Sequence, residues 1–288
     1  MTSTITAATT TIPVVLPLLD RVPGIRYAVS TRDAARSIGG DMSFSTGGDD
    51  PAGVIANRAA WLATVGATPE TAVMSGLVHG TAVMAVGAAD AGRGVRDPAT
   101  TITATDALIT NVVGLTLGMC FADCTPLLLV DPIRRAIGLG HAGWRGTLAG
   151  MPGAMVRAMR DTYSSDPADL LAVIGPTIGP ETYEVGADVA EPFAVAFPDA
   201  AILCPVADKP GKWLLDLGAA NAMQFARAGL ASAHVAASGI CTLTQGDQFF
   251  SHRYARAHHE REGRFAVFLR LTDHEAPHDD RNGDTTPA

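Results

Sequence analysis

Residues able to bind a metal or attack a substrate gather in one segment, from Phe121 to Gly146. Cys124 precedes an apolar run, and His141 follows a second apolar run after the turn Asp131-Pro132. Two strands joined by so short a turn would bring Cys124 and His141 towards the same end of a sheet. A thiolate and an imidazole placed together form either a metal site or a nucleophile–base pair, and these two residues leave both interpretations open.

A second histidine widens the choice of chemistry. His79 lies in the stretch GLVHGTAV, far from Cys124 and His141 in the sequence, and these separations exceed those of a zinc finger. One Cys and two His suit Zn²⁺ or, as an alternative, copper. Three protein ligands leave a fourth position for water or substrate, which is typical of a catalytic zinc. The structural alternative is that a strand cysteine is a small hydrophobe and each histidine is simply hydrogen-bonded.

Composition limits the partners. Among 288 residues, 29 are acidic and 21 basic, so the net charge is −8. This balance argues against nucleic acid or an anionic membrane surface as the partner, and an anionic substrate would need a local basic pocket. Four cysteines are too few for a disulfide scaffold and favour free thiols in a reducing cytoplasm. The apolar N-terminal patch contains two prolines and no preceding basic residue, so it is a poor signal peptide, and no stretch is long enough to span a membrane.

Strand and helix patterns mix without strict βαβ alternation. They predict an α+β or mixed α/β fold, with mixed sheets and helices packed on the outside of a single compact domain. We expect a flexible segment at 1–20, the catalytic domain at 21–272 and a disordered tail at 273–288. Asp50 and Asp216 are expected helix N-caps. The expected helices are 51–65, 147–163, 188–197 and 216–228, and a loop carrying His258 precedes the last strand at 264–271.

The motifs resemble those of the laccase-domain family, also called polyphenol oxidases or bacterial purine nucleoside phosphorylases. The resemblance rests on VHG, DALIT, ADCTPLLLVD, GHAGWRG, IGPTIGPETYEVG and FFSHR, and it runs from Ser30 to Leu271. It implies that His79, Cys124 and His141 bind a metal, usually zinc. Two departures bear on substrate selection: Leu77 stands where the family usually has Gln, and His252 where it usually has Tyr.

The resemblance also implies phosphorolysis of purine nucleosides to free base and ribose 1-phosphate, with adenosine deamination in some members. The substrates would then be a purine nucleoside and phosphate, and the oligomeric state, monomer or homodimer, stays open. Arginine pairs with phosphate through two parallel hydrogen bonds, and an aromatic ring can stack on a purine. Our candidates for phosphate are Arg32, Arg58 and Arg145, those for the purine are Trp144 and Tyr183, and those for the general acid or base are Asp123, Asp106 and Glu184.

Three other functions compete with phosphorolysis. A multicopper phenol oxidase needs about ten His ligands, whereas the chain has eight His, two of them in the expected tail. A metal-free hydrolase that edits cell-wall precursors would use Cys124 as nucleophile and His141 as base. A structural metal site in a binding protein would need a fourth protein ligand. For Cys120, four residues before Cys124, we expect a side chain that faces the core.

Overall fold

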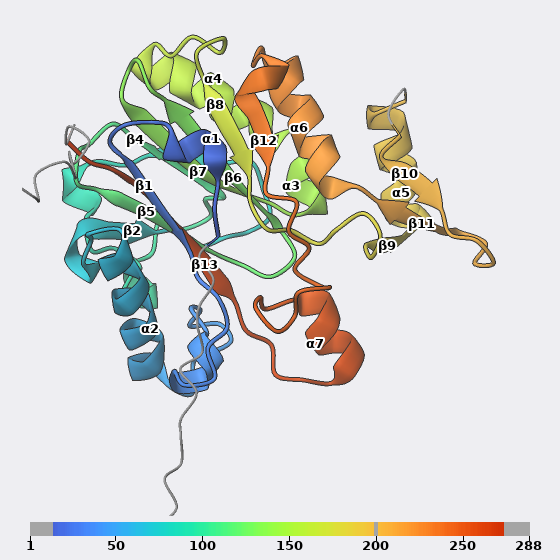
Figure 1. The fold of residues 1–288 in the computed structure, drawn as a ribbon, viewed down its shortest axis with the longest axis horizontal. Coiled ribbons are helices and arrows are strands. Elements are labelled where there is room, and N and C mark those ends of the chain that lie inside the picture. Colours follow the sequence, from blue (N-terminus) through green and yellow to red (C-terminus); the bar gives the residue numbers. More distant parts are fainter. Residues whose placement is uncertain (1–13, 199–200, 274–288) are drawn as a thin grey trace, which may run out of the picture.

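Two β-sheets packed face to face form the centre of the molecule (Figure 1). The computed structural model describes residues 14–198 and 201–273. The six-stranded sheet has the order β12 (Val235–Ala237), β8 (Leu171–Ile174), β6 (Thr125–Asp131), β7 (Ala136–Ala142), β4 (Ala107–Thr110), β3 (Val83–Ala85). The four-stranded sheet has the order β1 (Ile25–Val29), β13 (Phe265–Leu271), β5 (Thr116–Phe121), β2 (Ala72–Met74). Both sheets contain parallel and antiparallel pairs, as expected for a mixed fold.

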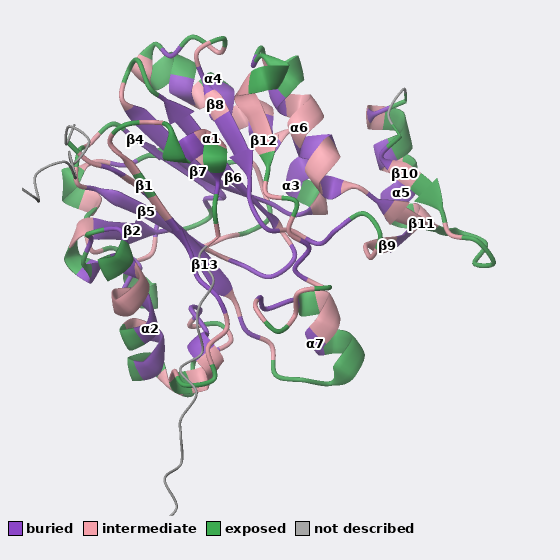
Figure 2. Cartoon of the chain, in the orientation of Figure 1, coloured by how far each residue is buried: buried purple, intermediate pink, exposed green. Residues whose placement is uncertain are grey.

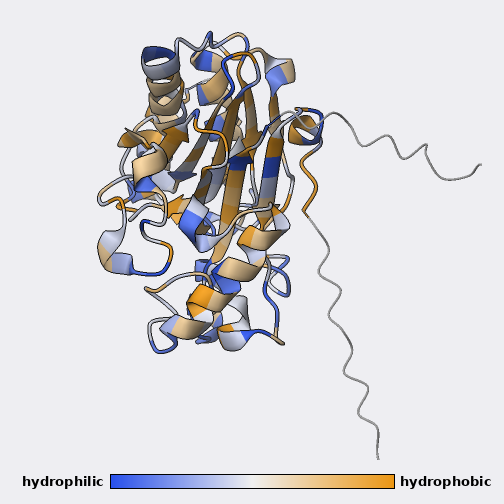
Figure 3. Ribbon diagram, turned by 90° about the vertical axis from the view of Figure 1, so that its left-hand side faces the viewer, coloured by the Kyte–Doolittle hydropathy of each residue, from blue (hydrophilic) through white to orange (hydrophobic). Residues whose placement is uncertain are grey.

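Alternation along the strands supplies the core. In β5, Leu117, Met119 and Phe121 face the six-stranded sheet and join the largest apolar cluster. Gly118 and Cys120 point to the opposite face, because successive side chains of a strand alternate. Figure 2 shows that the buried residues follow the strands and the inner sides of the helices. Figure 3 shows the strands as the most hydrophobic elements of the molecule.

Helices cover the two outer faces of the sheets. Helix α2 (Pro51–Thr64) packs on the four-stranded sheet, and α4 (Met151–Tyr163) and α6 (Leu217–Arg227) pack on the six-stranded one. The side chains of Asp50 and Asp216 accept backbone N–H groups at the starts of α2 and α6, which confirms both expected caps. The layers are therefore helix, sheet, sheet and helix, and the predicted single compact domain with outer helices is confirmed.

A small sheet lies beside this body. It consists of β9 (Glu184–Gly186), β10 (Leu203–Pro205) and β11 (Lys212–Leu215), and α5 (Ala187–Ala196) packs on it (Figure 1). The remaining helices are α1 (Pro17–Asp20), α3 (Trp144–Leu148) and α7 (His252–His258). Short 3₁₀ turns occur at Ser37–Gly40, Pro69–Thr71, Ala88–Asp90, Pro98–Thr100 and Ser232–His234.

Three expectations need correction. The helix expected at 147–163 is divided into α3 and α4 at Gly150, whose φ of +89° no α-helix accommodates. The loop expected to carry His258 is instead α7, which the hydroxyl of Ser251 caps. In the segment expected to be flexible, residues 14–20 include α1, and Leu16 and Leu19 are fully buried. Residues 1–13 and 274–288, the rest of that segment and nearly all of the expected tail, lie outside the described residues.

Within the described residues, no helix has the length and apolar character needed to cross a membrane.

Candidate functional site

The buried carboxylate of Asp106 organises two of the three predicted ligands. Its oxygens accept the backbone N–H groups of Val78 (3.2 Å), His79 (2.9 Å) and Gly80 (2.8 Å). One oxygen also accepts Nδ1–H of His141 at 3.1 Å, which leaves Nε2 of that ring available. His79 has φ of +62°, a conformation that costs energy in a non-glycine residue and that this set of hydrogen bonds stabilises. A single carboxylate therefore positions both histidines.

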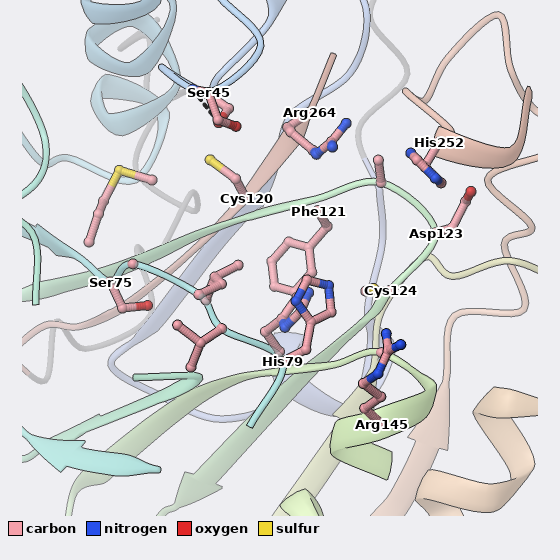
Figure 4. A pocket seen from close by; sticks show the side chains of 18 of the residues that line it. Ser45, Ser75, His79, Cys120, Phe121, Asp123, Cys124, Arg145, His252 and Arg264 are labelled. Atoms are coloured by element: carbon pink, nitrogen blue, oxygen red, sulfur yellow. Dashed lines mark hydrogen bonds between the residues drawn. The ribbon is translucent and has the colours of Figure 1, made fainter. Parts of the chain in front are cut away.

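Strand pairing places the cysteine beside them. In the antiparallel pair β6–β7, Pro126 lies opposite His141, so Cys124 arrives at the same edge of the sheet, as the sequence predicted. The ligand atoms of His79, Cys124 and His141 lie within 4.8 Å of one another. Within the described residues this is the only such group of three. Figure 4 labels Cys124 and His79 among the side chains that line the adjoining cavity.

Asp123 holds the turn that carries Cys124. Its φ is +78°, and its carboxylate accepts the hydroxyl of Thr242 and the backbone N–H of Arg253, both at 2.7 Å. Arg253 lies in the first turn of α7, so this carboxylate joins the cysteine turn to that helix. Both carboxylate oxygens therefore accept protein donors.

Gly143, which has no side chain, leaves room for the side chains of Cys124 and His79. A Cβ atom on Gly143 would lie 2.9 Å from Sγ of Cys124 and 3.2 Å from Cδ2 of His79. Contacts this short require the ligands to move, because real Cβ atoms almost never approach so closely. The HAGWRG segment therefore needs glycine at this position.

The electrostatics favour a thiolate. Burial opposes ionisation of Cys124, but the charge and hydrogen bonds of His141 and His79 outweigh it and lower the pKa of the thiol to about 6. Burial also opposes a charge on His141, yet Cys124 and Asp106 together raise the pKa of its imidazole to about 9. Without a metal, these residues form a thiolate–imidazolium pair.

The donor set fits a metal ion of borderline softness. One thiolate and two imidazoles are ordinary zinc ligands, and three of them leave a fourth tetrahedral position. The contact from Asp106 to His141 has the arrangement that orients a metal-binding histidine and raises its basicity. The group is therefore able to hold a divalent cation.

The cavity above this group has a volume of about 940 Å³, at the upper end of the range for ligand sites. The charged groups on its wall are mostly cationic. Arg58, Arg145, Arg253 and Arg264 line it, and Asp123 is the only acidic residue that does so in the part of the chain that the structure describes. A protein of net charge −8 thus has the local basic pocket that an anionic substrate requires.

The structure brings some of the predicted substrate residues to this cavity. Trp144, Arg145 and Tyr183 line it, and the guanidinium carbon of Arg145 lies 4.3 Å from the centre of the Trp144 ring. Arg145 is exposed. Burial, followed by the nearby charge of Cys124, raises the pKa of Tyr183 to about 12, so its phenol stays protonated. Figure 4 labels Arg145 among the side chains that line the cavity.

The guanidinium groups of the other two predicted phosphate-binding arginines donate to backbone carbonyls. Arg58 is buried, and its Nε and Nη1 donate to the carbonyls of Met42, Gly94 and Val95 at 2.7–2.8 Å. It joins two loops of the cavity wall and also lines the cavity. Arg32 is not among the lining residues, because its Nη1 donates to the carbonyl of Gly246 at 2.9 Å.

The candidates for acid–base work are also engaged elsewhere. Glu184 does not line the cavity and pairs with Lys209 at 2.7 Å. Asp106 and Asp123 are committed to the contacts described above. Cys120, expected in the core, packs on the cluster beneath α2 but also lines the cavity, because it lies at the end of β5 where that cluster ends.

The sequence did not predict that the basic residues His252, Arg253 and Arg264 line the cavity. Glu262 accepts from Nδ1 of His252 and from Nη2 of Arg264, each at 3.1 Å. Burial opposes the charge of Glu262, but His252 and Arg264 together lower the pKa of this carboxyl group. His252 and Arg264 both line the cavity, as does Arg253. The only sequence signal was the histidine and arginine of the FFSHR motif.

Comparison with known proteins identifies the family. A model of the family described as multi-copper polyphenol oxidoreductase laccase matches residues 26–272. The chain belongs to this family.

Relatives carry a different name from the family. A protein of Geobacillus stearothermophilus named purine nucleoside phosphorylase YlmD is 36% identical over 252 residues, which cover 85% of this chain and 90% of that protein. The Bacillus subtilis protein of the same name is 32% identical over 225 residues and covers 78% of this chain and 80% of its own.

Solved structures share the fold. The crystal structure of YlmD from G. stearothermophilus has a TM-score of 0.81 at 32% identity and covers 90% of this chain and 94% of its own. The structure of a Bacillus licheniformis hypothetical protein, YfiH, has a TM-score of 0.79 at 28% identity, covering 86% and 93% respectively.

Proposed function

We propose that the protein is a zinc-dependent purine nucleoside phosphorylase, which converts a purine nucleoside and phosphate to the free base and ribose 1-phosphate. The observation that carries this proposal is the convergence of His79, Cys124 and His141 within 4.8 Å on the wall of an arginine-lined cavity. The names of the two relatives support the same reaction. Zinc in this position would supply a Lewis acid and a bound water of lowered pKa.

In the reaction, an oxygen of phosphate forms a bond to C1′ of the ribose. The bond from C1′ to the purine nitrogen breaks, and its electron pair leaves with the purine. The purine becomes the free base by taking up the proton that hydrogen phosphate releases as it becomes ribose 1-phosphate. Arg145 is the first candidate to bind the phosphate, because it is exposed and lines the cavity, and because its guanidinium makes no hydrogen bond or ion pair to any described residue. A guanidinium binds two phosphate oxygens at once and offsets their negative charge. Arg264 and Arg253 are further candidates, although each already donates to protein oxygens.

The purine base would lie against Tyr183 and Trp144. Both rings line the cavity, and each already has a guanidinium over or beside it: Arg253 at 5.3 Å from Tyr183 and Arg145 at 4.3 Å from Trp144. An aromatic wall next to cationic groups suits a base on one side and an anion on the other. Asp106 and Asp123 act in this proposal by positioning the metal ligands rather than by transferring protons.

Adenosine deamination belongs to the same proposal as a secondary activity, because a metal with a free fourth position could present hydroxide to the purine. The copper phenol oxidase receives less support: within the described residues one group of three ligands is present, whereas a multicopper centre requires several groups. The metal-free Cys124–His141 hydrolase would give His79 only a supporting role, although it lies in the same group of three.

A product assay with a metal count tests the proposal. The purified protein is analysed for zinc and copper and then incubated with adenosine, inosine or guanosine, with and without inorganic phosphate. We expect one zinc per chain, and free base together with ribose 1-phosphate only when phosphate is present. Inosine formed from adenosine without phosphate would measure deamination. A protein that holds copper and oxidises phenols but leaves the nucleosides intact would overturn the proposal.

A matched pair of variants links the activity to the site. Cys124→Ala removes a proposed zinc ligand and should abolish both zinc binding and phosphorolysis. Cys204→Ala changes an exposed cysteine that does not line the cavity, so it should retain both. Alkylation provides a further distinction, because bound zinc should protect Cys124, whereas a metal-free nucleophile would react.

A further inference from the structure

The hydroxyl group of Tyr183 has no hydrogen-bond partner among the described residues. The side chain lines the cavity above the metal-ligand group and is partly buried. Its phenol oxygen is not one of the fully buried unpaired atoms, so it keeps contact with the space of the cavity. By contrast, the phenol of Tyr27 donates to Asp20 at 2.6 Å and accepts the backbone N–H of Leu16 at 2.7 Å. Because a tyrosine hydroxyl in a partly buried position usually has a partner, the free hydroxyl of Tyr183 indicates that a ligand completes it.

The position of this ring is fixed from several sides. The backbone N–H of Tyr183 donates to the carbonyl of Gly179, and its carbonyl accepts the N–H of Leu215, both at 3.0 Å. The ring packs on the apolar cluster of the small sheet. The guanidinium carbon of Arg253 lies 5.3 Å from the ring centre, and Nη1 of Arg253 donates to the carbonyl of Glu184, the next residue, at 2.8 Å. A phenol held in this way presents its hydroxyl group in one place, so a ligand that binds it pays little for ordering the side chain.

Charged groups of the metal site and of the arginine wall surround the phenol. Burial has the largest effect on the pKa of Tyr183 and raises it to about 12, and the charges of Cys124, Arg253, Asp123 and Arg145 act on it in turn. The hydroxyl is therefore a donor at neutral pH. Because the effect of a charge on a titrating group falls with distance, these four groups are neighbours of the phenol. An anion held by Arg145 would lie in the same neighbourhood.

The ring of Tyr183 offers separate places to the two proposed substrates. A purine stacks on the face of an aromatic ring, whereas the hydroxyl group lies in the plane of the ring, at its edge. A base that lies parallel to the ring therefore does not accept a hydrogen bond from the hydroxyl of the same ring. The hydroxyl remains available to a group at the ring edge, where charged groups of the cavity are its neighbours.

We propose that the hydroxyl group of Tyr183 donates a hydrogen bond to the reacting phosphate, beside the guanidinium of Arg145. A hydrogen bond to an ionised oxygen is shorter than one between neutral groups and about twice as strong. The inference rests on the proposed function, because it takes the anion in this cavity to be the phosphate that attacks C1′. Tyr183 then contacts both substrates, the purine with its face and the phosphate with its edge.

The variant Tyr183→Phe tests the proposal, because it removes the hydroxyl group and keeps the ring. In calorimetry of the purified full chain with inorganic phosphate as the titrant, the Kd of the variant should rise by about tenfold or more, the usual effect of a lost charged hydrogen bond. In steady-state kinetics, the KM for phosphate should rise while the KM for the nucleoside stays unchanged. An unchanged Kd and KM for phosphate would overturn the proposal. A rise confined to the KM for the nucleoside would overturn it too, because the hydroxyl would then contact the base or the ribose.

Tyr254→Phe is the matched control. The ring of Tyr254 stacks on His258 with 4.0 Å between the ring centres, and Tyr254 does not line the cavity. The same chemical change should therefore leave the binding of phosphate unaltered. Thermal unfolding separates binding from structure: without phosphate, Tyr183→Phe should unfold at the wild-type temperature, because the lost hydroxyl has no partner among the described residues. Phosphate in excess should then raise the Tm of the wild type more than that of Tyr183→Phe. A Tm lowered equally with and without phosphate would show a structural role and contradict the proposal.

The titration also distinguishes this inference from the proposed function, because phosphate binding needs no turnover. If the wild type binds phosphate more tightly than Tyr183→Phe but releases no base from nucleosides, the contact between the hydroxyl and phosphate is supported and the phosphorylase reaction is refuted. If the wild type releases base in the presence of phosphate and Tyr183→Phe has the same Kd and KM for phosphate, the reaction is supported and the role of the hydroxyl is refuted.

Discussion

Replacing Asp106 with asparagine should weaken the metal site more than it weakens the fold. The side chain is fully buried, and its oxygens accept three backbone N–H groups as well as Nδ1–H of His141. An amide keeps one acceptor oxygen but presents an NH₂ group where the second oxygen accepts. At least one donor then loses its partner, at a cost of about 1–3 kcal/mol in the free energy of unfolding.

The effect on the metal follows from the same contacts. The carboxylate fixes the ring of His141 and raises its basicity, and it holds the backbone of His79 in an unfavourable conformation. Losing such an outer contact usually costs roughly 10–100-fold in metal affinity or activity. We therefore expect the zinc Kd of Asp106→Asn to rise by about that factor, and kcat/KM for phosphorolysis to fall similarly at limiting zinc.

Competition with a chromogenic chelator measures the zinc Kd, and thermal unfolding of the zinc-free protein measures stability separately. Asp131→Asn is the matched control, because Asp131 is equally buried at the far end of β6 and accepts only N–H groups of its own turn. It should change stability without changing zinc affinity. If Asp106→Asn binds zinc within about threefold of the wild type while its Tm falls, Asp106 is only a structural residue and the reasoning is refuted.

Three other expectations follow from individual contacts. Gly143→Ala should reduce zinc binding, since the new Cβ would lie 2.9 Å from Sγ of Cys124. The control Gly87→Ala adds a Cβ with nothing within 4 Å and should bind zinc normally. Equal zinc affinities of the two variants would show that the loop around Gly143 adjusts freely. Chelation of zinc at neutral pH should increase iodoacetamide labelling of Cys124, because its pKa of about 6 leaves the metal-free thiol largely ionised. Peptide mass spectrometry measures the labelling. Labelling that does not change on chelation would indicate that no metal protects Cys124. Burial and the hydrogen bond to Asp20 raise the pKa of Tyr27 to about 12, so the protonated phenol contributes stability that is complete below about pH 10 and is lost as the pH rises through 12. Tyr27→Phe should therefore unfold more easily than the wild type at pH 8 and should lose less stability between pH 9 and 12. Denaturation midpoints of the two proteins that change in parallel across that range would contradict this.

The centre of the site could be predicted because its geometry is local to a hairpin. The apolar runs on either side of Asp131-Pro132 fix the register of β6 and β7, and that register places Cys124 and His141 at one edge. His79 came from its residue type and from the family resemblance. Nothing in its spacing showed that it would approach the other two, because Asp106 brings it there through backbone contacts that leave no pattern in the sequence.

The roles of the arginines were harder to predict, because these too depend on backbone contacts that leave no pattern in the sequence. An arginine looks the same in the sequence whether its guanidinium faces a substrate or backbone carbonyl groups. Arg58 lies on α2, where a solvated position is common, yet the helix packs so that its side chain reaches three carbonyls. Arg264 precedes β13 and was passed over, although the strand brings it to the cavity.

The carboxylates of the site show why acid–base roles cannot be assigned from residue type alone. Asp106 and Asp123 stand next to proposed ligands in space or in sequence, which made both candidates for proton transfer. In the structure each accepts several N–H or O–H donors. Burial opposes the charge of Asp106, but the hydrogen bonds from His141, Gly80 and His79 outweigh it and lower the pKa of this carboxyl group. A carboxylate held by several donors is fixed in place and orients the residues that donate to it. The cavity therefore combines fixed anions behind its ligands with cations on its open wall, and an anionic co-substrate is attracted to the open side.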